Sequence, residues 1–414
     1  MSARARTGGR LRIGIISLAS PTWLAGQGLT DVIVEALWRA HDPEREQLYL
    51  IAPDWAATAR EGVEILRLPP AATLSLVGKA VRRSVAARDR LPWLPGEWSI
   101  RRRLGLTDPS NPIHVARING IDVALPVVGM YAPRVDVRCV GWIPDFQHRF
   151  LPGMFSPGEI ENRTVGQAAL AAGCARMILS SRAVERQFAE IYPESAPKTR
   201  VASFPSQFAF RPPAGDARAV LGTYGLPEKF ALVVNQFWAH KNHEVVLDAL
   251  QLLAARGRGV PIVLAGAPVD SRDPQGRYLS NLFQKIVRAR ISSDVLLLGR
   301  VPFPDLVGLL RCATVVVQPS RFEGWNTTVE DALALGRPLL CSDLDVHREQ
   351  ARGEVGFFGC DRPDQLADLL TERWESCSPG PDPVREAAAL ADEARVAASY
   401  GEVLIRTCRE AAAG

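Results

Sequence analysis

The sequence predicts an α/β protein made of two doubly wound domains, each a parallel sheet with helices on both faces. At 414 residues the chain is too long for one ordinary domain and suits two of about 150–200 residues. Short apolar runs alternate with amphipathic stretches along both halves, which is typical of parallel sheets covered by helices. A stretch rich in proline and glycine, residues 204–228, separates the two series.

The first series predicts a domain over residues 1–207. Strands are expected at residues 11–17, 47–51, 63–68, 123–128, 138–142, 177–180 and 201–204. Helices are expected at residues 31–39, 74–87, 157–172 and 184–191, with Ser181 as a suitable N-cap for the last of them. Residues 25–28, Ala-Gly-Gln-Gly, are expected to form a loop ahead of the first helix.

The second series predicts a domain over residues 208–384, followed by a final helical segment at 385–414. Strands are expected at residues 230–234, 262–265, 295–298, 315–317 and 339–341, and helices at 244–255, 363–374 and 384–412. Doubly wound domains bind ligands at the carboxyl ends of their strands. A cleft between two such domains is therefore the expected active site.

The most informative segment is residues 321–343, which follows a predicted strand. Asn326 and Thr327 are both good N-cap residues, so a helix is expected to begin there with its free N–H groups pointing out of its end. Gly336 is expected to end that helix. The N-terminus of a helix placed after a strand is a suitable site for phosphate.

Acidic side chains surround this helix start. Glu323 lies ahead of Gly324, while Glu330 and Asp331 lie within the helix. Such acids are suited to holding sugar hydroxyls beside a bound phosphate, which suggests a nucleotide-sugar site. A purely structural interpretation is also open, because acids near a helix N-terminus stabilise the helix dipole in any strand–loop–helix unit.

The segment resembles the signature of retaining glycosyltransferases of the GT-B fold, the GT4-like or glycosyl transferases group 1 family. The matching features are the Glu-Gly-aromatic start, a second acid eight residues later, then Ala, Gly, Pro and Ser-Asp. The resemblance implies two Rossmann-like domains facing each other across a cleft, with the final helix packing back toward the first domain. It implies that Glu323 holds the donor sugar. The second acid is Asp331 instead of the usual Glu, so whether Glu330 or Asp331 holds the ribose stays open.

The same family carries an Arg and, five residues later, a Lys that neutralise the donor's diphosphate. Lys241 matches the Lys, whereas Gln236 stands at the Arg position. An amide cannot replace a bidentate cation. Either Arg321, Arg300 or a group of the first domain supplies the second charge, or diphosphate binding is weaker than is typical of the family. The alternative for Lys241 is an exposed lysine in a first helical turn.

Further positions follow from the resemblance. Gly299 and Arg300 match the strand-end segment whose backbone contacts the nucleobase, and Gly28 matches a glycine-rich loop near the diphosphate. Asp145 and His148 are expected on the sugar and acceptor side, where Pro144 replaces the family's His. A core or surface histidine is the alternative for His148. The predicted catalytic residues are Glu323, Lys241, Asp145 and His148, and the predicted donor-binding residues are Gly28, Gln236, Gly299, Arg300, Gly324, Trp325, Asn326, Thr327, Thr328, Glu330 and Asp331.

The implied function is transfer of a hexosyl unit from a nucleotide-diphosphate sugar to a hydroxyl of a saccharide or lipid-linked acceptor, in bacterial cell-surface polysaccharide or glycolipid assembly. Two alternatives are a non-catalytic nucleotide-sugar-binding homologue and a nucleotide-sugar epimerase on the same fold. No metal or other cofactor is expected, because Lys241 and the helix N-terminus supply the positive charge. The pair His240 and His243 lacks a third nearby ligand, and the seven scattered cysteines are expected to be small core residues.

Charge is unevenly distributed along the chain, whose net charge is +4. Residues 79–103 contain eight basic and two acidic side chains with tryptophans among them. That pattern suits peripheral contact with an anionic membrane surface, and a solvated helical surface is the alternative. No nucleic-acid-binding module accompanies the patch. Because no apolar run approaches the ~18–20 residues of a membrane span, we expect a cytoplasmic protein, with the basic segment at the inner face of the cell membrane.

Overall fold

The computed structural model describes residues 9–20, 25–57, 60–69, 110–129, 137–268, 270 and 272–414. The chain forms two compact units: residues 1–146, 157–204 and 397–414 in the first, and residues 147–156 and 205–396 in the second. Each contains one sheet, and every pairing between described strands is parallel. The predicted class, two doubly wound parallel-sheet domains, is confirmed. The predicted helix at 74–87 and the basic segment 79–103 lie outside the described residues.

The sheet of the first unit has the strand order β3-β2-β1-β4-β5-β6-β7. Its strands are β1 (Leu11–Ile16), β2 (Glu46–Pro53), β3 (Val63–Leu68), β4 (Val123–Val127), β5 (Arg138–Ile143), β6 (Arg176–Leu179) and β7 (Thr199–Val201). Its helices are α1 (Ala25–Ala40), α4 (Pro112–Ile118), α6 (Pro157–Gly173), α7 (Arg182–Ile191) and the C-terminal part of α15 (Pro383–Ala413). Short 3-10 turns are η1 (Asp54–Ala56) and η4 (Pro193–Lys198).

β4, in the middle of this sheet, is apolar and buried along its whole length because helices cover both faces. One core contains alternate strand residues such as Tyr49 and Ile51 together with apolar side chains of α4, α6 and α7. Leu29 of α1 and Tyr400 of α15 face residues of β4, β5 and β6 from the other side. Burial on both faces is the usual reason for such continuous apolar strands in parallel sheets.

The loop expected at residues 25–28 is wrong, because these residues form the first turn of α1. Thr30 Oγ1 donates to the Gly26 carbonyl at 2.8 Å, and Gln27 Nε2 donates to Asp31 Oδ1 at 2.9 Å, so side chains one turn apart stabilise this end of the helix. Gly28 therefore lies within a helix. The glycine composition favoured a loop, but contacts along the helix overcome that local preference.

The sheet of the second unit has the order β10-β9-β8-β11-β12-β13. Its strands are β8 (Ala231–Val234), β9 (Ile262–Ala265), β10 (Val295–Gly299), β11 (Val315–Gln318), β12 (Leu339–Ser342) and β13 (Val355–Phe358). Its helices are α5 (Gln147–Phe150), α8 (Ala219–Tyr224), α9 (His243–Ala255), α10 (Arg277–Arg288), α11 (Phe303–Cys312), α12 (Thr327–Ala334), α13 (Asp345–Gln350), α14 (Pro363–Ser376) and the first part of α15. Short 3-10 turns are η3 (Pro152–Met154), η5 (Gln207–Ala209) and η6 (Ala239–Lys241).

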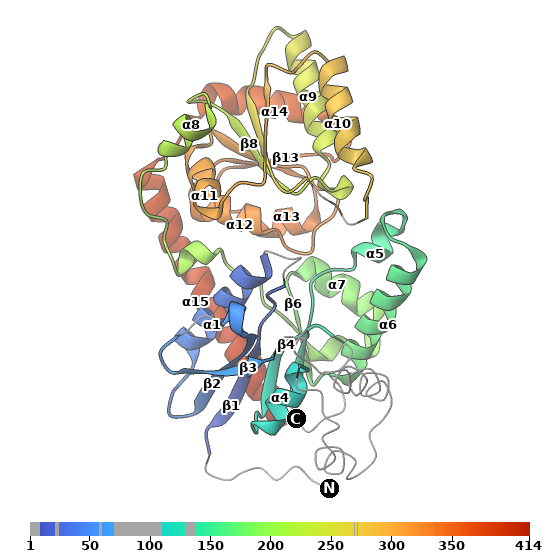
Figure 1. The fold of residues 1–414 in the computed structure, drawn as a ribbon, viewed down its shortest axis with the longest axis vertical. Coiled ribbons are helices and arrows are strands. Elements are labelled where there is room, and N and C mark those ends of the chain that lie inside the picture. The colour runs from blue at the N-terminus through green and yellow to red at the C-terminus, as the bar shows by residue number, and fades with distance from the viewer. Residues whose placement is uncertain are drawn as a thin grey trace. The chain divides into compact units, whose positions relative to one another are not determined.

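Helices cover both faces of this second sheet as well (Figure 1). Val233 of β8 points into a core shared with α9, α10 and α14, whereas its neighbour Leu232 points into a core shared with α8, α11 and α12. This alternation follows from the two-residue period of a strand. Because helices cover both faces, a ligand can reach this sheet only at the ends of its strands, where the loops lie.

Candidate functional site

In the second unit, β8 and β11 are neighbours at the place where the strand order reverses, and a loop follows each of them. β8 pairs with β11 on one side and with β9 on the other, and the chain passes from β8 to β9 before returning at β11. Ligands of doubly wound sheets bind at such a place. We call residues 235–242 and 319–326 the switch-point loops; they contain Lys241 and Glu323.

A buried pair of amides fastens the two strands where these loops begin. Asn235 follows β8 and Gln318 ends β11. Asn235 Nδ2 donates to Gln318 Oε1 at 3.0 Å, and Gln318 Nε2 donates back to Asn235 Oδ1 at 3.1 Å. Both residues are buried. Such reciprocal bonds satisfy polar groups that would otherwise be costly to bury, and they fix the relative position of the two loops.

Lys241 and Glu323 are 82 residues apart in sequence and form an ion pair across the switch-point loops. Lys241 Nζ lies 2.6 Å from Glu323 Oε1, and the two side chains are only 16% and 10% exposed. The first loop presents Lys241 at the end of η6, next to Asn242, whose positive φ of 55° is tolerated best by Asn and Gly. Asn242 Nδ2 donates to the Pro319 carbonyl at 3.1 Å, which ties this turn to the second loop.

The electrostatics of the pair favour its charged form. Burial is the largest single influence and raises the pKa of Glu323, but the charges of Lys241 and His240 and the hydrogen bonds from Lys241 and Ser320 together outweigh it, so the pKa of this carboxyl lies below its ordinary value. Burial, followed by the charge of Lys241, lowers the pKa of the neighbouring His240 to about 3, so that His240 is neutral. The site thus holds one fixed anion and one fixed cation that neutralise each other.

The histidines beside this pair are buried. His243 is fully buried, and its ring stacks on Phe237 with centroids 4.6 Å apart. Burial lowers its pKa to about 3. Among the residues that the structure describes, no group of three or more His, Cys, Asp or Glu side chains is placed to hold a metal ion.

The predicted helix start after Glu323 is present as α12. Asn326 is its N-cap, and its Oδ1 accepts from the Val329 N–H at 3.1 Å. Gln350 of α13 holds the cap in place, because its Nε2 donates to the Asn326 carbonyl at 3.0 Å and its Oε1 accepts from the Asn326 N–H at 3.2 Å. The Oδ1 of Asn326 is therefore used within the cap, whereas its Nδ2 is buried and donates to no residue that the structure describes. Gly336, with a φ of 62°, follows the helix as predicted.

The first turn of α12 leaves backbone donors for an anion. Thr328 Oγ1 donates to the Val234 carbonyl at the end of β8, at 3.2 Å, so the helix start is anchored to the switch point. Within the described part of the chain, the N–H groups of Thr327 and Thr328 donate to no other group. Unbonded N–H groups at a helix N-terminus attract phosphate and carboxylate.

The two acids inside α12 have different surroundings. Glu330 is fully buried, with one oxygen bonded by Gln350 Nε2 at 2.9 Å and the other by Arg352 Nη2 at 2.8 Å. Asp331 is partly buried, and its Oδ1 accepts from Ser206 Oγ at 2.6 Å. Burial raises the pKa of Asp331 to about 7, against the lowering effect of the Ser206 hydrogen bond.

Arg321 and Arg300 were expected to supply the positive charge that Gln236 lacks, and they differ in whether an acidic partner already engages them. Arg321 is engaged by Asp361, 2.5 Å away. Arg300 is exposed and forms no ion pair with any residue that the structure describes. The structure shows a further cation that the sequence analysis missed: the Arg272 guanidinium lies 4.9 Å above the Trp238 ring and is bonded to Asp270 at 3.0 Å.

Other predicted donor residues lie on loops of the second sheet. Gly299 ends β10, and its carbonyl accepts from the Gly266 N–H at 2.8 Å. Gly324 is buried and Trp325 is half-buried in the loop between Glu323 and the cap of α12.

The remaining predicted residues come from the first half of the sequence. Asp145 follows β5 in the first unit, and its carbonyl accepts from Gln167 Nε2 at 2.9 Å. His148, in the part of the chain that belongs to the second unit, is fully buried with its ring edge-on to Phe155. Gly28 lies in α1 of the first unit. Their roles stay predictions.

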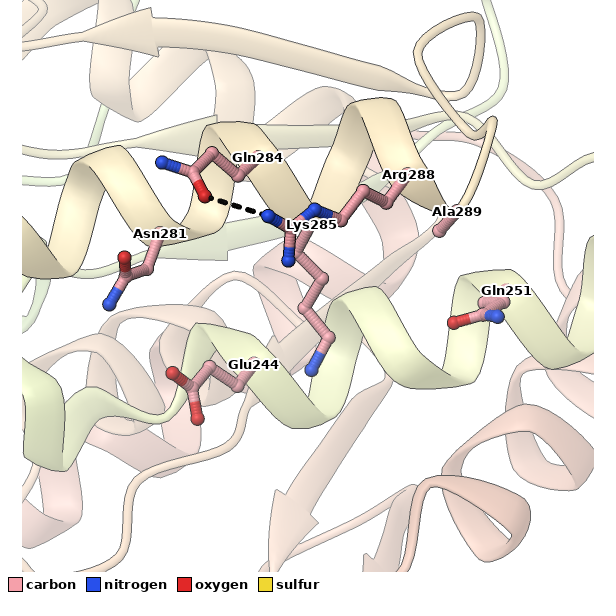
Figure 2. Close-up of a pocket in the computed structure, with 7 residues that line it drawn as sticks. All are labelled: Glu244, Gln251, Asn281, Gln284, Lys285, Arg288 and Ala289. Carbon is pink, nitrogen blue, oxygen red and sulfur yellow. Dashed lines mark hydrogen bonds between the residues drawn. The ribbon is translucent and has the colours of Figure 1, made fainter.

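A separate groove lies between α9 and α10, and it contains none of the predicted site residues (Figure 2). Its volume is about 330 Å³, and apart from Ala289 its lining residues are polar or charged: Glu244, Gln251, Asn281, Gln284, Lys285 and Arg288. Figure 2 shows Lys285 reaching from α10 toward α9, where its Nζ bonds Asp248 at 2.7 Å. The switch-point loops, not this groove, gather the predicted chemistry.

Part of the second unit is similar to known proteins. Residues 224–388 match the family model of glycosyl transferases group 1. The O-antigen chain mannosyltransferase B of Escherichia coli is 30% identical over 155 residues, which is 37% of this chain and 39% of that protein. The D-inositol 3-phosphate glycosyltransferase of Nocardia farcinica is 28% identical over 228 residues, covering 52% and 49%. The chain thus matches half or less of the length of these curated relatives.

Solved structures share the fold over nearly the whole chain. A sucrose-phosphate synthase from Thermosynechococcus elongatus has a TM-score of 0.64 at 14% identity over 97% of each chain. The HepE protein of Anabaena, in complex with UDP and glucose, has a TM-score of 0.56 at 15% identity over 97% of this chain and 98% of that one. Within the described residues no helix is long and apolar enough to cross a membrane. The chain therefore shares the fold of the GT-B glycosyltransferases, and its residues 224–388 are similar to the glycosyl transferases group 1 family.

Proposed function

We propose that this protein is a retaining glycosyltransferase that moves a hexosyl unit from a nucleotide-diphosphate sugar to an acceptor hydroxyl. The observation that carries the proposal is the Lys241–Glu323 ion pair, 2.6 Å across, at the switch point of the family domain and beside the N-terminus of α12. The acceptor is a saccharide or a lipid-linked saccharide of bacterial cell-surface polysaccharide or glycolipid assembly. The name of the mannosyltransferase relative and the UDP and glucose bound to the HepE neighbour support this substrate class.

In the proposed reaction the donor separates the ion pair. The diphosphate takes the place of Glu323 as the partner of Lys241 and is also met by the N–H groups of Thr327 and Thr328. These groups stabilise the negative charge that develops on the departing nucleoside diphosphate, which is the electrostatic part of catalysis. The released carboxylate of Glu323 then accepts hydrogen bonds from hydroxyls of the donor sugar. We propose that this charge replaces a bound metal ion at the diphosphate.

The positions outside this pair complete the proposed site. Arg300, exposed at the end of β10, is the best available second cation, because Arg321 is engaged by Asp361. Gly299 lies next to the nucleobase, as the family resemblance implies. Asp145 and His148 serve the sugar and acceptor side, and residues 79–103 hold the cytoplasmic protein at the inner face of the membrane.

The test is a donor panel read first by thermal shift and then by product analysis. A donor that binds only the folded state raises its melting temperature. Transfer to an acceptor extract, or donor hydrolysis, should be lost in Glu323→Gln and kept in Glu228→Gln, whose side chain is 80% exposed. Donor binding without any product would favour a non-catalytic homologue. Conversion of the donor alone to an epimer would favour an epimerase, and either result would overturn the proposal.

A further inference from the structure

Ser206, in the segment that enters the second unit, makes hydrogen bonds to fixed partners through its N–H, its hydroxyl proton and its Oγ. Its N–H donates to Glu393 Oε1 of α15 at 2.6 Å. Its Oγ accepts from the Phe208 N–H at 3.1 Å, which caps η5. Its hydroxyl donates to Asp331 Oδ1 of α12 at 2.6 Å. The residue is 3% exposed, so these bonds form without competition from solvent.

This arrangement sets the direction of the hydroxyl. Because the Phe208 N–H occupies a lone pair of Oγ, the single hydroxyl proton is directed to the carboxylate of Asp331. The second oxygen, Asp331 Oδ2, accepts no hydrogen bond from any residue that the structure describes. Asp331 Oδ1 is therefore bonded to the Ser206 hydroxyl, and Asp331 Oδ2 is available as an acceptor beside the start of α12.

The neighbouring charges hold the rest of this network in place. Arg352 Nη2 lies 2.8 Å from Glu330 Oε2 and 2.7 Å from Glu393 Oε2, so a single guanidinium joins two buried carboxylates. Both oxygens of Glu330 are taken, and its side chain is fully buried. Of the two acids of α12, Asp331 is the one with an oxygen that accepts no hydrogen bond from the described residues, and it is also the less buried.

We infer that Ser206 is a positioning residue that holds Asp331 so that its free oxygen accepts hydrogen bonds from the ribose hydroxyls of the donor nucleotide. The inference rests on the proposed function and extends it to a residue outside the predicted site. Ser206 is 125 residues from Asp331 in sequence, and no local sequence motif predicts their contact.

The charge state of Asp331 gives the inference a second readout. Burial raises the pKa of Asp331 to about 7, the Ser206 hydrogen bond lowers it, and the charge of Glu330 raises it. Burial and the charge of Glu330 also raise the pKa of Glu393 to about 7, which the Arg352 charge opposes. A carboxylate is a better acceptor for sugar hydroxyls than a carboxylic acid. Nucleotide binding should therefore strengthen as the pH rises through about 7, and loss of the Ser206 hydroxyl should move that midpoint upward.

The test compares two probes, UDP and 2′,3′-dideoxy-UDP, by calorimetry at pH 7 and pH 9. Ser206→Ala should weaken UDP binding about fivefold to tenfold at pH 7 and less at pH 9, as for a lost bond to a charged acceptor. It should leave the dideoxy analogue unchanged, and Ser206→Thr should restore UDP binding. In an Asp331→Asn background, Ser206→Ala should have no further effect. Equal losses for both probes, or no loss for UDP, would overturn the inference.

Two controls separate this role from simple loss of structure and from failure of the proposed function. Ser181→Ala removes a buried capping serine of α7, whose Oγ accepts from the Val184 N–H at 3.0 Å, and should not change UDP binding. The ligand-free titration of ¹³C-labelled aspartate, assigned by its absence in Asp331→Asn, should show a raised midpoint in Ser206→Ala. An unshifted midpoint would show that Ser206 does not hold this carboxylate. If the midpoint shifts but neither UDP nor GDP binds the wild type, the proposed function fails and the ribose role fails with it.

Discussion

Separating the Lys241–Glu323 ion pair by mutation should cost far more than losing a surface ion pair. Lys241→Met removes the cation and leaves the Glu323 carboxylate in a site where the side chains are only 16% and 10% exposed. Glu323→Gln removes the anion instead, and the double variant removes both charges. The cycle formed by these three variants isolates the interaction between the two side chains.

The expected magnitude follows from the geometry. At 2.6 Å, opposite unit charges attract by about 6 kcal/mol at an effective dielectric constant of ~20, and desolvation of both groups offsets much of this. Lys241→Met should therefore lower the free energy of unfolding by ~3 kcal/mol, the lower end for a broken buried pair. The double variant should lose ~2 kcal/mol less than the sum of the two single variants, because no charge is left unpaired.

The sign of the pH dependence can be stated in advance. In the wild type the pKa of Glu323 is lowered, so the pair contributes stability above the ordinary carboxyl pKa and loses it as the pH falls through the folded-state value. In Lys241→Met, burial without the cation raises that pKa, so the penalty is full at pH 7.5 and shrinks as the pH falls and the carboxyl becomes protonated.

Urea unfolding followed by tryptophan fluorescence at pH 7.5 and pH 5 measures these effects. Lys285→Met is the matched control, because Lys285 and Asp248 form a pair of similar length, 2.7 Å, with side chains 30% and 38% exposed. It should cost less than 1 kcal/mol, as exposed pairs do. Additive losses in the cycle, or equal losses for Lys241→Met and Lys285→Met at pH 7.5, would refute the reasoning.

Three further predictions concern the scaffold of the second unit and the final helix. Arg352→Met leaves the buried Glu330 and Glu393 without their cation. It should lower the free energy of unfolding by ~3–5 kcal/mol at pH 8 and by less at pH 5.5, where the carboxyls become protonated. Equal losses at both pH values in urea unfolding would contradict this. Asn235→Leu should cost ~1–3 kcal/mol, because the amide of Gln318 is left buried without its partner, and restoration by Gln318→Leu would check the cause. Gly401→Ala places a Cβ 2.5 Å from a backbone carbonyl of α1 and should lower the melting temperature, whereas Gly222→Ala, with nothing within 4 Å, should not.

The parts of the site carried by local sequence signals were predicted well. The capped start of α12 at Asn326 and the glycine after its end depend on residues within a few positions of each other, and each has a physical reason that is visible in the sequence. The strand at Ile262–Ala265 was predicted to the residue, because a fully apolar run between polar loops has few alternatives in a doubly wound fold. Local chemistry and period were sufficient for these elements.

Some elements were missed although a local signal was present, and others depend on contacts far apart in sequence. α10, a helix of 12 residues, has a clear amphipathic pattern that could have been recognised in the sequence. α13 and β13, at 6 and 4 residues, are too short for their period to be distinct without the sheet that they pack against. The choice between Glu330 and Asp331 could not be made either. Adjacent residues on a helix point about 100° apart, and only the packing against Arg352 and Ser206 shows which of them is enclosed.

The switch point explains why residues from two distant local motifs, Lys241 and Glu323, lie together in the candidate site. In a doubly wound sheet, the strand order alone brings the ends of β8 and β11 side by side, whatever the loops contain. The Asn235–Gln318 amide pair then fixes those ends, so that the short loops beyond them have little freedom to keep Lys241 and Glu323 apart. The strand order thus brings the motifs of the two loops together in space. The residues that adjust this site, such as Ser206, come from segments whose approach the topology of this sheet does not determine, and they had to be found in the structure.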